Sequence, residues 1–95
     1  MLIVKKFGGK ALETKEGIFN TVKICSEDYN NGNDIILVLS ARGNETDKLI
    51  KEMKEINEGV DERELDMILA TGEQKSVSVM ASAFRKNGIP AISLN

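Results

Sequence analysis

Lys6, Gly8 and Gly9 are the first residues in the chain whose types and spacing could do chemistry. Adjacent glycines let backbone N–H groups approach an anion closely, and the lysine ammonium adds a point charge suited to phosphate. A plain turn between a strand and a helix explains the same residues, and taken alone they favour that turn. The spacing excludes a Walker P-loop, which would need a glycine where the chain has Val4, and the dinucleotide-binding fingerprint is also absent.

Two further polar segments follow later in the chain. Ser40 comes directly after an apolar run and Thr46 precedes the next one, so both hydroxyls could bind a carboxylate or phosphate near a helix N-terminus. Helix capping explains Thr46 equally well. Glu73 follows Thr71 in the first turn of a predicted helix, where its carboxylate could hold an ammonium group. The helix dipole is a sufficient structural reason for a carboxylate at that position. Physical argument alone favours this structural explanation over a ligand-binding role.

Hydrophobic periodicity predicts the elements that position these residues. Residues 2–7 are expected to form a short strand, and residues 35–39 form an uninterrupted apolar run, typical of a parallel strand covered on both faces. Between them the spacing predicts a helix from about Thr14 to about Asn30. Its expected inward face carries Ile18, Phe19, Val22, Cys25 and Tyr29.

The second half of the chain is predicted to be mainly helical. A helix ending near Gly59 is predicted from the spacing of Leu49, Ile50, Met53 and Ile56. Asp61 and Glu64 have the spacing of a capping box and predict the start of another helix. Thr71 and Gln74 repeat this spacing, so we expect that helix to break and restart there and to end near Asn87.

Residues 89–94 are expected to form a third strand, which completes the order strand, helix, strand, helices, strand. This order predicts an α/β fold, a three-layer αβα arrangement with a mainly parallel sheet, of which the first three strands and their helices are present. Such sheets have about five or six strands, so we expect a longer protein to continue beyond residue 95. Because ligands bind beyond the carboxyl ends of parallel strands, the three polar segments are expected to converge at one edge.

Composition limits the classes of function. The 95 residues fit one small domain or part of one, and the net charge of −2 gives no electrostatic surface for nucleic acid. The chain has no histidine, which excludes a histidine-based metal site or catalytic triad. Its single cysteine, Cys25, is interpreted as a small core residue in a reducing compartment. No apolar run is long enough to cross a membrane and no signal peptide is recognisable, so we expect a cytoplasmic location.

Together these segments resemble the aspartokinase family over essentially all 95 residues. The matching stretches are VKKFGG at 4–9, ILVLSA at 36–41, ETDKLI at 45–50, RELDMILATGEQ at 63–74 and GIPAISL at 88–94. The stretch at 63–74 is the most specific, with no close counterpart in the related uridylate, glutamate or acetylglutamate kinases. The chain departs from the family at Lys10 and Ala11, where small hydroxyl residues are usual, and at Arg42, which replaces an apolar residue.

The resemblance implies an amino-acid-kinase fold and phosphoryl transfer from ATP, with Mg²⁺, to the side-chain carboxylate of L-aspartate, at the start of lysine, threonine and methionine synthesis. By motif match, Lys6 would be the catalytic residue and would contact the transferring phosphate together with Gly8 and Gly9. Ser40, Thr46 and Glu73 would bind substrate, with Glu73 holding the amino group. No metal ligand is assigned to these 95 residues, and a homo-oligomer is expected.

Residues 1–95 are therefore expected to be the N-terminal portion of an aspartokinase catalytic domain, inactive alone. The nucleotide-binding half and the regulatory ACT domains would lie beyond Asn95. One alternative is a non-catalytic binding or self-associating module derived from the same fold. A second alternative is a kinase that acts on a different amino acid.

Overall fold

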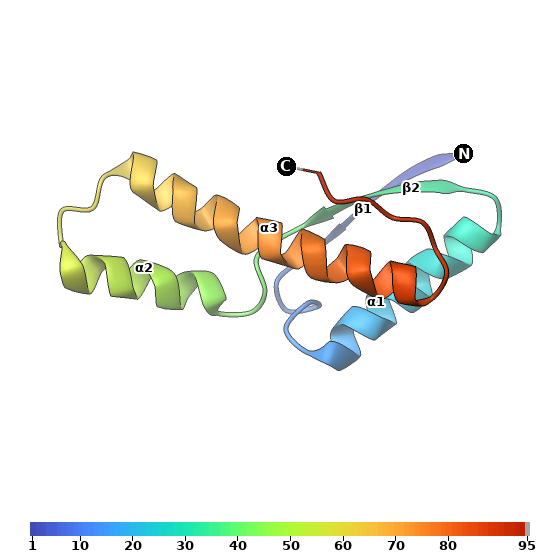
Figure 1. Ribbon diagram of the computed structural model, residues 1–95, viewed down its shortest axis with the longest axis horizontal. Coiled ribbons are helices and arrows are strands. Elements are labelled where there is room, and N and C mark those ends of the chain that lie inside the picture. Colours follow the sequence, from blue (N-terminus) through green and yellow to red (C-terminus); the bar gives the residue numbers. More distant parts are fainter. Residues whose placement is uncertain (95) are drawn as a thin grey trace.

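The computed structural model describes residues 1–94. In chain order they form strand β1 (Leu2–Phe7), helix α1 (Lys15–Asn30), strand β2 (Asp34–Leu39), helix α2 (Glu45–Ile56) and helix α3 (Glu62–Lys86) (Figure 1). The two strands pair in parallel, with Leu2 opposite Asp34 and Phe7 opposite Leu39. Their carboxyl ends therefore lie at the same edge, as the predicted parallel α/β arrangement requires.

Helix α1 begins as predicted. The side chain of Thr14 accepts a hydrogen bond from the N–H of Gly17 at 3.0 Å, which satisfies one of the free donors of the first turn. The buried residues of the helix are Ile18, Thr21, Val22 and Cys25. Phe19 and Tyr29 were expected on the same face but are exposed, because they lie at the margins of the helical stripe that faces the sheet.

Helix α3 is continuous from Glu62 to Lys86, so the predicted break at Thr71 is wrong. The helix start is as predicted, since the Asp61 side chain accepts a hydrogen bond from the N–H of Glu64 at 3.2 Å. Thr71 does not cap a new helix; its hydroxyl donates to the carbonyl oxygen of Met67, one turn earlier in the same helix, at 3.0 Å. Glu73 consequently lies in the middle of a helix, where the helix dipole no longer explains its carboxylate.

One face of the sheet is covered and the other is open. Helices α1 and α3 pack over the covered face, where the core consists of Leu12, Ile18, Val22, Cys25, Leu39, Met80 and Phe84. Leu2, Val4, Ile36 and Val38 point to the opposite face and are exposed. The predicted cover on both faces of residues 35–39 is therefore absent within residues 1–94. The reason is that α2 packs against α3 and extends beyond the sheet instead of crossing its second face (Figure 1).

Residues 89–94 do not form the predicted third strand. Ile89 and Ala91 pack against the core, and the segment runs back from the end of α3 (Figure 1). However, the N–H of Ile89 donates to Phe84 at 3.1 Å and the carbonyl oxygen of Ala91 accepts from Arg85 at 2.8 Å. These backbone groups are bound to the end of α3 and not to a neighbouring strand.

We predict that the 95-residue chain self-associates, because the sheet formed within residues 1–94 has two unpaired edges and an open apolar face there. Analytical ultracentrifugation should detect a dimer or larger oligomer, and Ile36→Lys should weaken the association at least about tenfold by placing a charge on the open face. The matched control is Ile56→Lys on α2, at a side chain that is 82% exposed and outside the sheet. A well-folded monomer at high protein concentration would contradict this prediction.

Candidate active site

The segment between β1 and α1, residues 8–14, is anchored to the core by one of its own side chains. Leu12 inserts into the core with a side chain that is 1% exposed, although it lies outside any helix or strand. Around it, the N–H of Leu12 donates to Gly9 at 3.2 Å and the N–H of Glu13 donates to Lys10 at 3.3 Å, giving two successive turns. The chain therefore leaves β1, passes Gly8 and Gly9, and is anchored by Leu12 before α1 begins.

The segments after β1 and β2 lie against each other. The N–H of Ser40 donates to Phe7 at 3.3 Å, and the N–H of Gly43 donates to Gly9 at 3.1 Å. A methyl group built on Gly9 would lie 2.6 Å from the carbonyl oxygen of Ala41, so any side chain at Gly9 would force the segments apart. A methyl group on Gly8 would meet nothing within 4 Å. Gly9 thus serves packing, whereas Gly8 presents open backbone that an anion can approach.

The third predicted segment reaches the same place from α3. A methyl group built on Gly72 would lie 3.0 Å from both the Cβ of Ala41 and the Oγ1 of Thr46. Ala41 is therefore packed between Gly9 and Gly72, and the three segments meet around it. The three polar segments therefore converge at one edge of the sheet, as expected. The chemical role of each of their residues stays a prediction.

The two lysines at the end of β1 have different surroundings. Lys5 points to the covered face, where its ammonium pairs with Asp28 of α1 at 2.5 Å. This hydrogen bond raises the pKa of Lys5, so the ammonium stays charged and remains bonded to Asp28. Lys6 points to the open face, opposite Val38 in the sheet, and is exposed. Alternation along the strand therefore leaves Lys6 as the lysine that can meet a ligand.

The remaining candidates differ in accessibility. Ser40 is half-buried at the carboxyl end of β2, and Glu73 is exposed on α3 beside Gly72. The Oγ1 atom of Thr46 is buried and has no hydrogen-bond partner among residues 1–94. No hydrogen bond or ion pair joins Lys6 or Glu73 to another candidate within this part of the chain.

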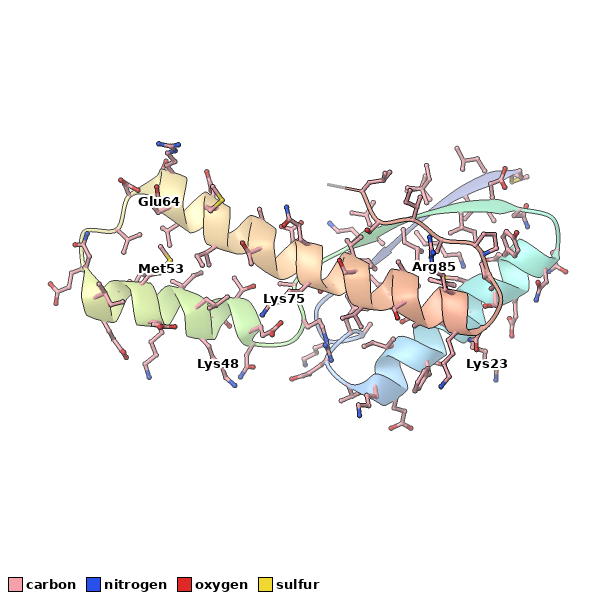
Figure 2. All side chains as sticks on the ribbon, in the orientation of Figure 1. Lys23, Lys48, Met53, Glu64, Lys75 and Arg85 are labelled. Carbon is pink, nitrogen blue, oxygen red and sulfur yellow. The ribbon has the colours of Figure 1, made fainter. Side chains whose placement is uncertain are left out.

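A carboxylate and an ammonium lie beside this site as a pair that the sequence did not predict. Glu45 opens α2, and its Oε1 atom lies 3.5 Å from the Nζ of Lys75, which points from α3 toward the start of α2 (Figure 2). The other carboxylate oxygen of Glu45 is buried and has no hydrogen-bond partner in the described part of the chain, and the same holds for the hydroxyl of the adjacent Thr46. Two neighbouring buried polar atoms without partners are unusual and favour a site that accepts a polar group. Glu45 and Lys75 are too far apart in sequence for any local pattern to link them.

Other features limit what this site can do. Burial raises the pKa of the Cys25 thiol, so the residue is a neutral core side chain, as expected, and not a nucleophile. Among residues 1–94 no three histidine, cysteine or acidic side chains gather into a group that could hold a metal ion. In the same residues, no helix has the length and apolar character needed to cross a membrane.

Comparison with known proteins identifies the class. The family model described as the amino acid kinase family matches residues 1–95, so the chain belongs to that family. Within it, the chain is similar to aspartokinases. It is 44% identical over 92 residues to an aspartokinase of Bacillus sp. (strain MGA3), covering 97% of this chain and 22% of the relative. It is 41% identical over 92 residues to an aspartate kinase of Stutzerimonas stutzeri (strain A1501), with the same two coverages.

A solved structure gives the same result in three dimensions. The crystal structure of aspartate kinase from Synechocystis matches with a TM-score of 0.95 and 38% sequence identity, covering 99% of this chain and 16% of that chain. The predicted resemblance and fold class are therefore confirmed. The chain spans about 22% of the length of the curated relatives named above.

Gly72→Ala tests the packing around Ala41. Replacing glycine by alanine inside a helix normally stabilises by roughly 0.5–1 kcal/mol. Here the new methyl group would lie 3.0 Å from the Cβ of Ala41, which cannot rotate away, and 3.0 Å from Thr46. We expect urea denaturation to show a loss of about 1–3 kcal/mol in the free energy of unfolding. Gly59→Ala, where the nearest atom would lie at 3.6 Å, is the control; a stabilised Gly72→Ala variant would contradict the close packing.

Proposed function

We propose that this chain is the substrate-binding part of an aspartokinase catalytic domain, which transfers a phosphoryl group from ATP to the side-chain carboxylate of L-aspartate. The observation that carries the proposal is the meeting of three segments around Ala41, at the carboxyl edge of a parallel sheet. The names of the relatives supply the substrate. Because the chain spans about 22% of those relatives, we further propose that the nucleotide-binding half and regulatory ACT domains lie outside residues 1–95.

The reaction suits a site without a general base. The side-chain carboxyl group of aspartate has a pKa of about 3.9, so the nucleophile is already ionised at neutral pH. The chain has no histidine, and this chemistry needs none. Catalysis then depends on positioning the two substrates and on stabilising the charge of the transferring group. ATP bound with Mg²⁺ supplies the phosphoryl group and part of that charge stabilisation.

The residues of this chain fit a phosphate at the open end of β1. Lys6 is exposed there and pairs with no carboxylate of residues 1–94, so its ammonium can neutralise charge on the transferring phosphoryl group. The backbone at Gly8 is open to an approaching anion. Gly9 acts indirectly, because its missing side chain lets the segment after β2 lie close to the same place.

Aspartate is assigned to the segments on the other side of Ala41. Ser40 and Thr46 offer hydroxyl groups, and a substrate group reaching Thr46 would give its buried Oγ1 the partner it lacks among residues 1–94. Glu73 is assigned to the amino group of the substrate. Its mid-helix position supports this role, because a helix N-terminus no longer accounts for the carboxylate. We place the enzyme in the cytoplasm as a homo-oligomer, at the start of lysine, threonine and methionine synthesis.

The proposal is tested on the polypeptide that the gene encodes, purified from its native source. We expect an intact mass well above 10.4 kDa and formation of an acyl phosphate that depends on both ATP and aspartate and is trapped with hydroxylamine. Glutamate in place of aspartate is the control, because activity with a different amino acid would indicate a different kinase of the family. A native product of 95 residues without activity would remove the assignment.

Lys6→Ala tests the catalytic assignment in that polypeptide. We expect kcat to fall by about 10²–10³-fold, as when a charge-stabilising group is removed, while KM for aspartate changes little. Lys48→Ala is the matched control, since Lys48 points into solvent from α2 (Figure 2). Turnover equal to that of the wild type would exclude Lys6 from the mechanism.

A second candidate is a non-catalytic, self-associating module built on the same fold. The open apolar face with Leu2, Val4, Ile36 and Val38 favours it, because an apolar surface of this kind suits a protein partner. A native chain of 95 residues that associates but has no kinase activity would support this candidate over the first.

A further inference from the structure

Arg42 makes a side-chain hydrogen bond between the segments that follow β1 and β2. It is half-buried, and its Nε donates to the carbonyl oxygen of Leu12 at 3.0 Å. Within residues 1–94 it is the only side chain with a hydrogen bond across these two segments.

The bond reinforces a set of contacts that are otherwise made by the backbone. The N–H of Gly43 donates to Gly9, and the carbonyl oxygen of Ala41 lies against the same glycine. On the other side, a methyl group built on Gly43 would lie 2.9 Å from the Cγ of Glu13, so the Glu13 side chain covers Gly43. The segments after β1 and β2 therefore contact each other on two sides. Arg42, in the segment after β2, bonds to Leu12 in the segment after β1.

Leu12 explains why this particular carbonyl matters. Its side chain is fixed in the core and its carbonyl is fixed by Arg42, so the residue is held at both ends. The residues between β1 and Leu12 then have little freedom, and they include Gly8, whose backbone faces open space. Without Arg42, the Leu12 carbonyl would lose its side-chain donor, and this stretch would be held by the buried Leu12 side chain, the turn bonds of 3.2 and 3.3 Å and the Gly43–Gly9 bond of 3.1 Å.

We propose that Arg42 is a positioning residue: by bonding to the Leu12 carbonyl it holds the segment of residues 8–12 in the conformation that presents Gly8 to a phosphate. The phosphate part of this inference rests on the function proposed above. Arg42 itself acts through Leu12 and does not need to touch the substrates. The proposal concerns the Nε–H donor of Arg42 and not its positive charge.

Three substitutions separate the donor from the charge. Glutamine places its amide nitrogen the same number of bonds from Cα as the Nε of arginine, so Arg42→Gln retains a donor but no charge. Arg42→Lys retains the charge but has a carbon atom at that position, and Arg42→Met has neither. Arg85→Met is the matched control, because Arg85 also donates its Nε to a carbonyl, that of Ala91, at the far end of α3 (Figure 2).

The polypeptide that the gene encodes is examined by two measurements. Hydrogen exchange of a peptide covering residues 8–14 should be about tenfold faster in Arg42→Met and Arg42→Lys, and close to wild type in Arg42→Gln and Arg85→Met. In the hydroxylamine assay, kcat/KM for ATP should fall about tenfold in the first two variants, with KM for aspartate within about twofold of wild type.

The outcomes separate failure of the Arg42 proposal from failure of the proposed function. Wild-type exchange and wild-type kinetics in Arg42→Met would overturn the proposal, and so would full activity in Arg42→Lys with loss in Arg42→Gln, because charge would then be the property that matters. If the wild-type protein has no aspartate-dependent activity, the proposed function fails. The exchange rates of the four variants still decide whether Arg42 holds residues 8–12.

Discussion

The packing of Ala41 between Gly9 and Gly72 is the contact on which the arrangement of the candidate site depends. A methyl group on Gly9 would lie 2.6 Å from the Ala41 carbonyl oxygen, and one on Gly72 would lie 3.0 Å from the Ala41 Cβ. The end of β1, the end of β2 and the middle of α3 can approach one another only because two of the three contribute no side chain. Interiors are packed too densely to absorb such extra atoms without displacing a backbone segment.

Strand β1 carries the candidate catalytic residue on one face of the sheet and residues that stabilise the fold on the other. Lys5 and Lys6 are neighbours in sequence, but Lys5 pairs with Asp28 under α1 whereas Lys6 lies on the open face. Strand alternation alone separates their roles, because successive side chains point to opposite sides of the sheet. The covered face carries the core, and the open face carries Lys6 together with exposed apolar residues such as Val4 and Ile36.

Several features could be predicted because they depend on local signals. The Thr14 and Asp61 caps, the buried positions of Ile18, Val22 and Cys25, and the parallel strands follow from capping chemistry and hydrophobic period. The helix break at Thr71 was wrong because a threonine followed three residues later by glutamine can also lie inside a helix, with its hydroxyl bonded to the preceding turn. The third strand was wrong because the backbone of residues 89–91 bonds to the end of α3 and not to a neighbouring strand.

By itself, the sequence determined the two parallel strands, the starts of α1 and α3 and the α/β class, and it singled out the candidate residues Lys6, Ser40, Thr46 and Glu73, since these depend on residue type and spacing. The tertiary structure decided how the candidates lie: the Oγ1 of Thr46 is buried beside Gly72, and Glu73 lies within a continuous helix. It also decided that Arg42 bonds across to Leu12. It also decided that one sheet face is open and that Glu45 lies beside Lys75. These features join residues that are distant in the chain, and no local pattern encodes which distant atoms meet when the elements pack.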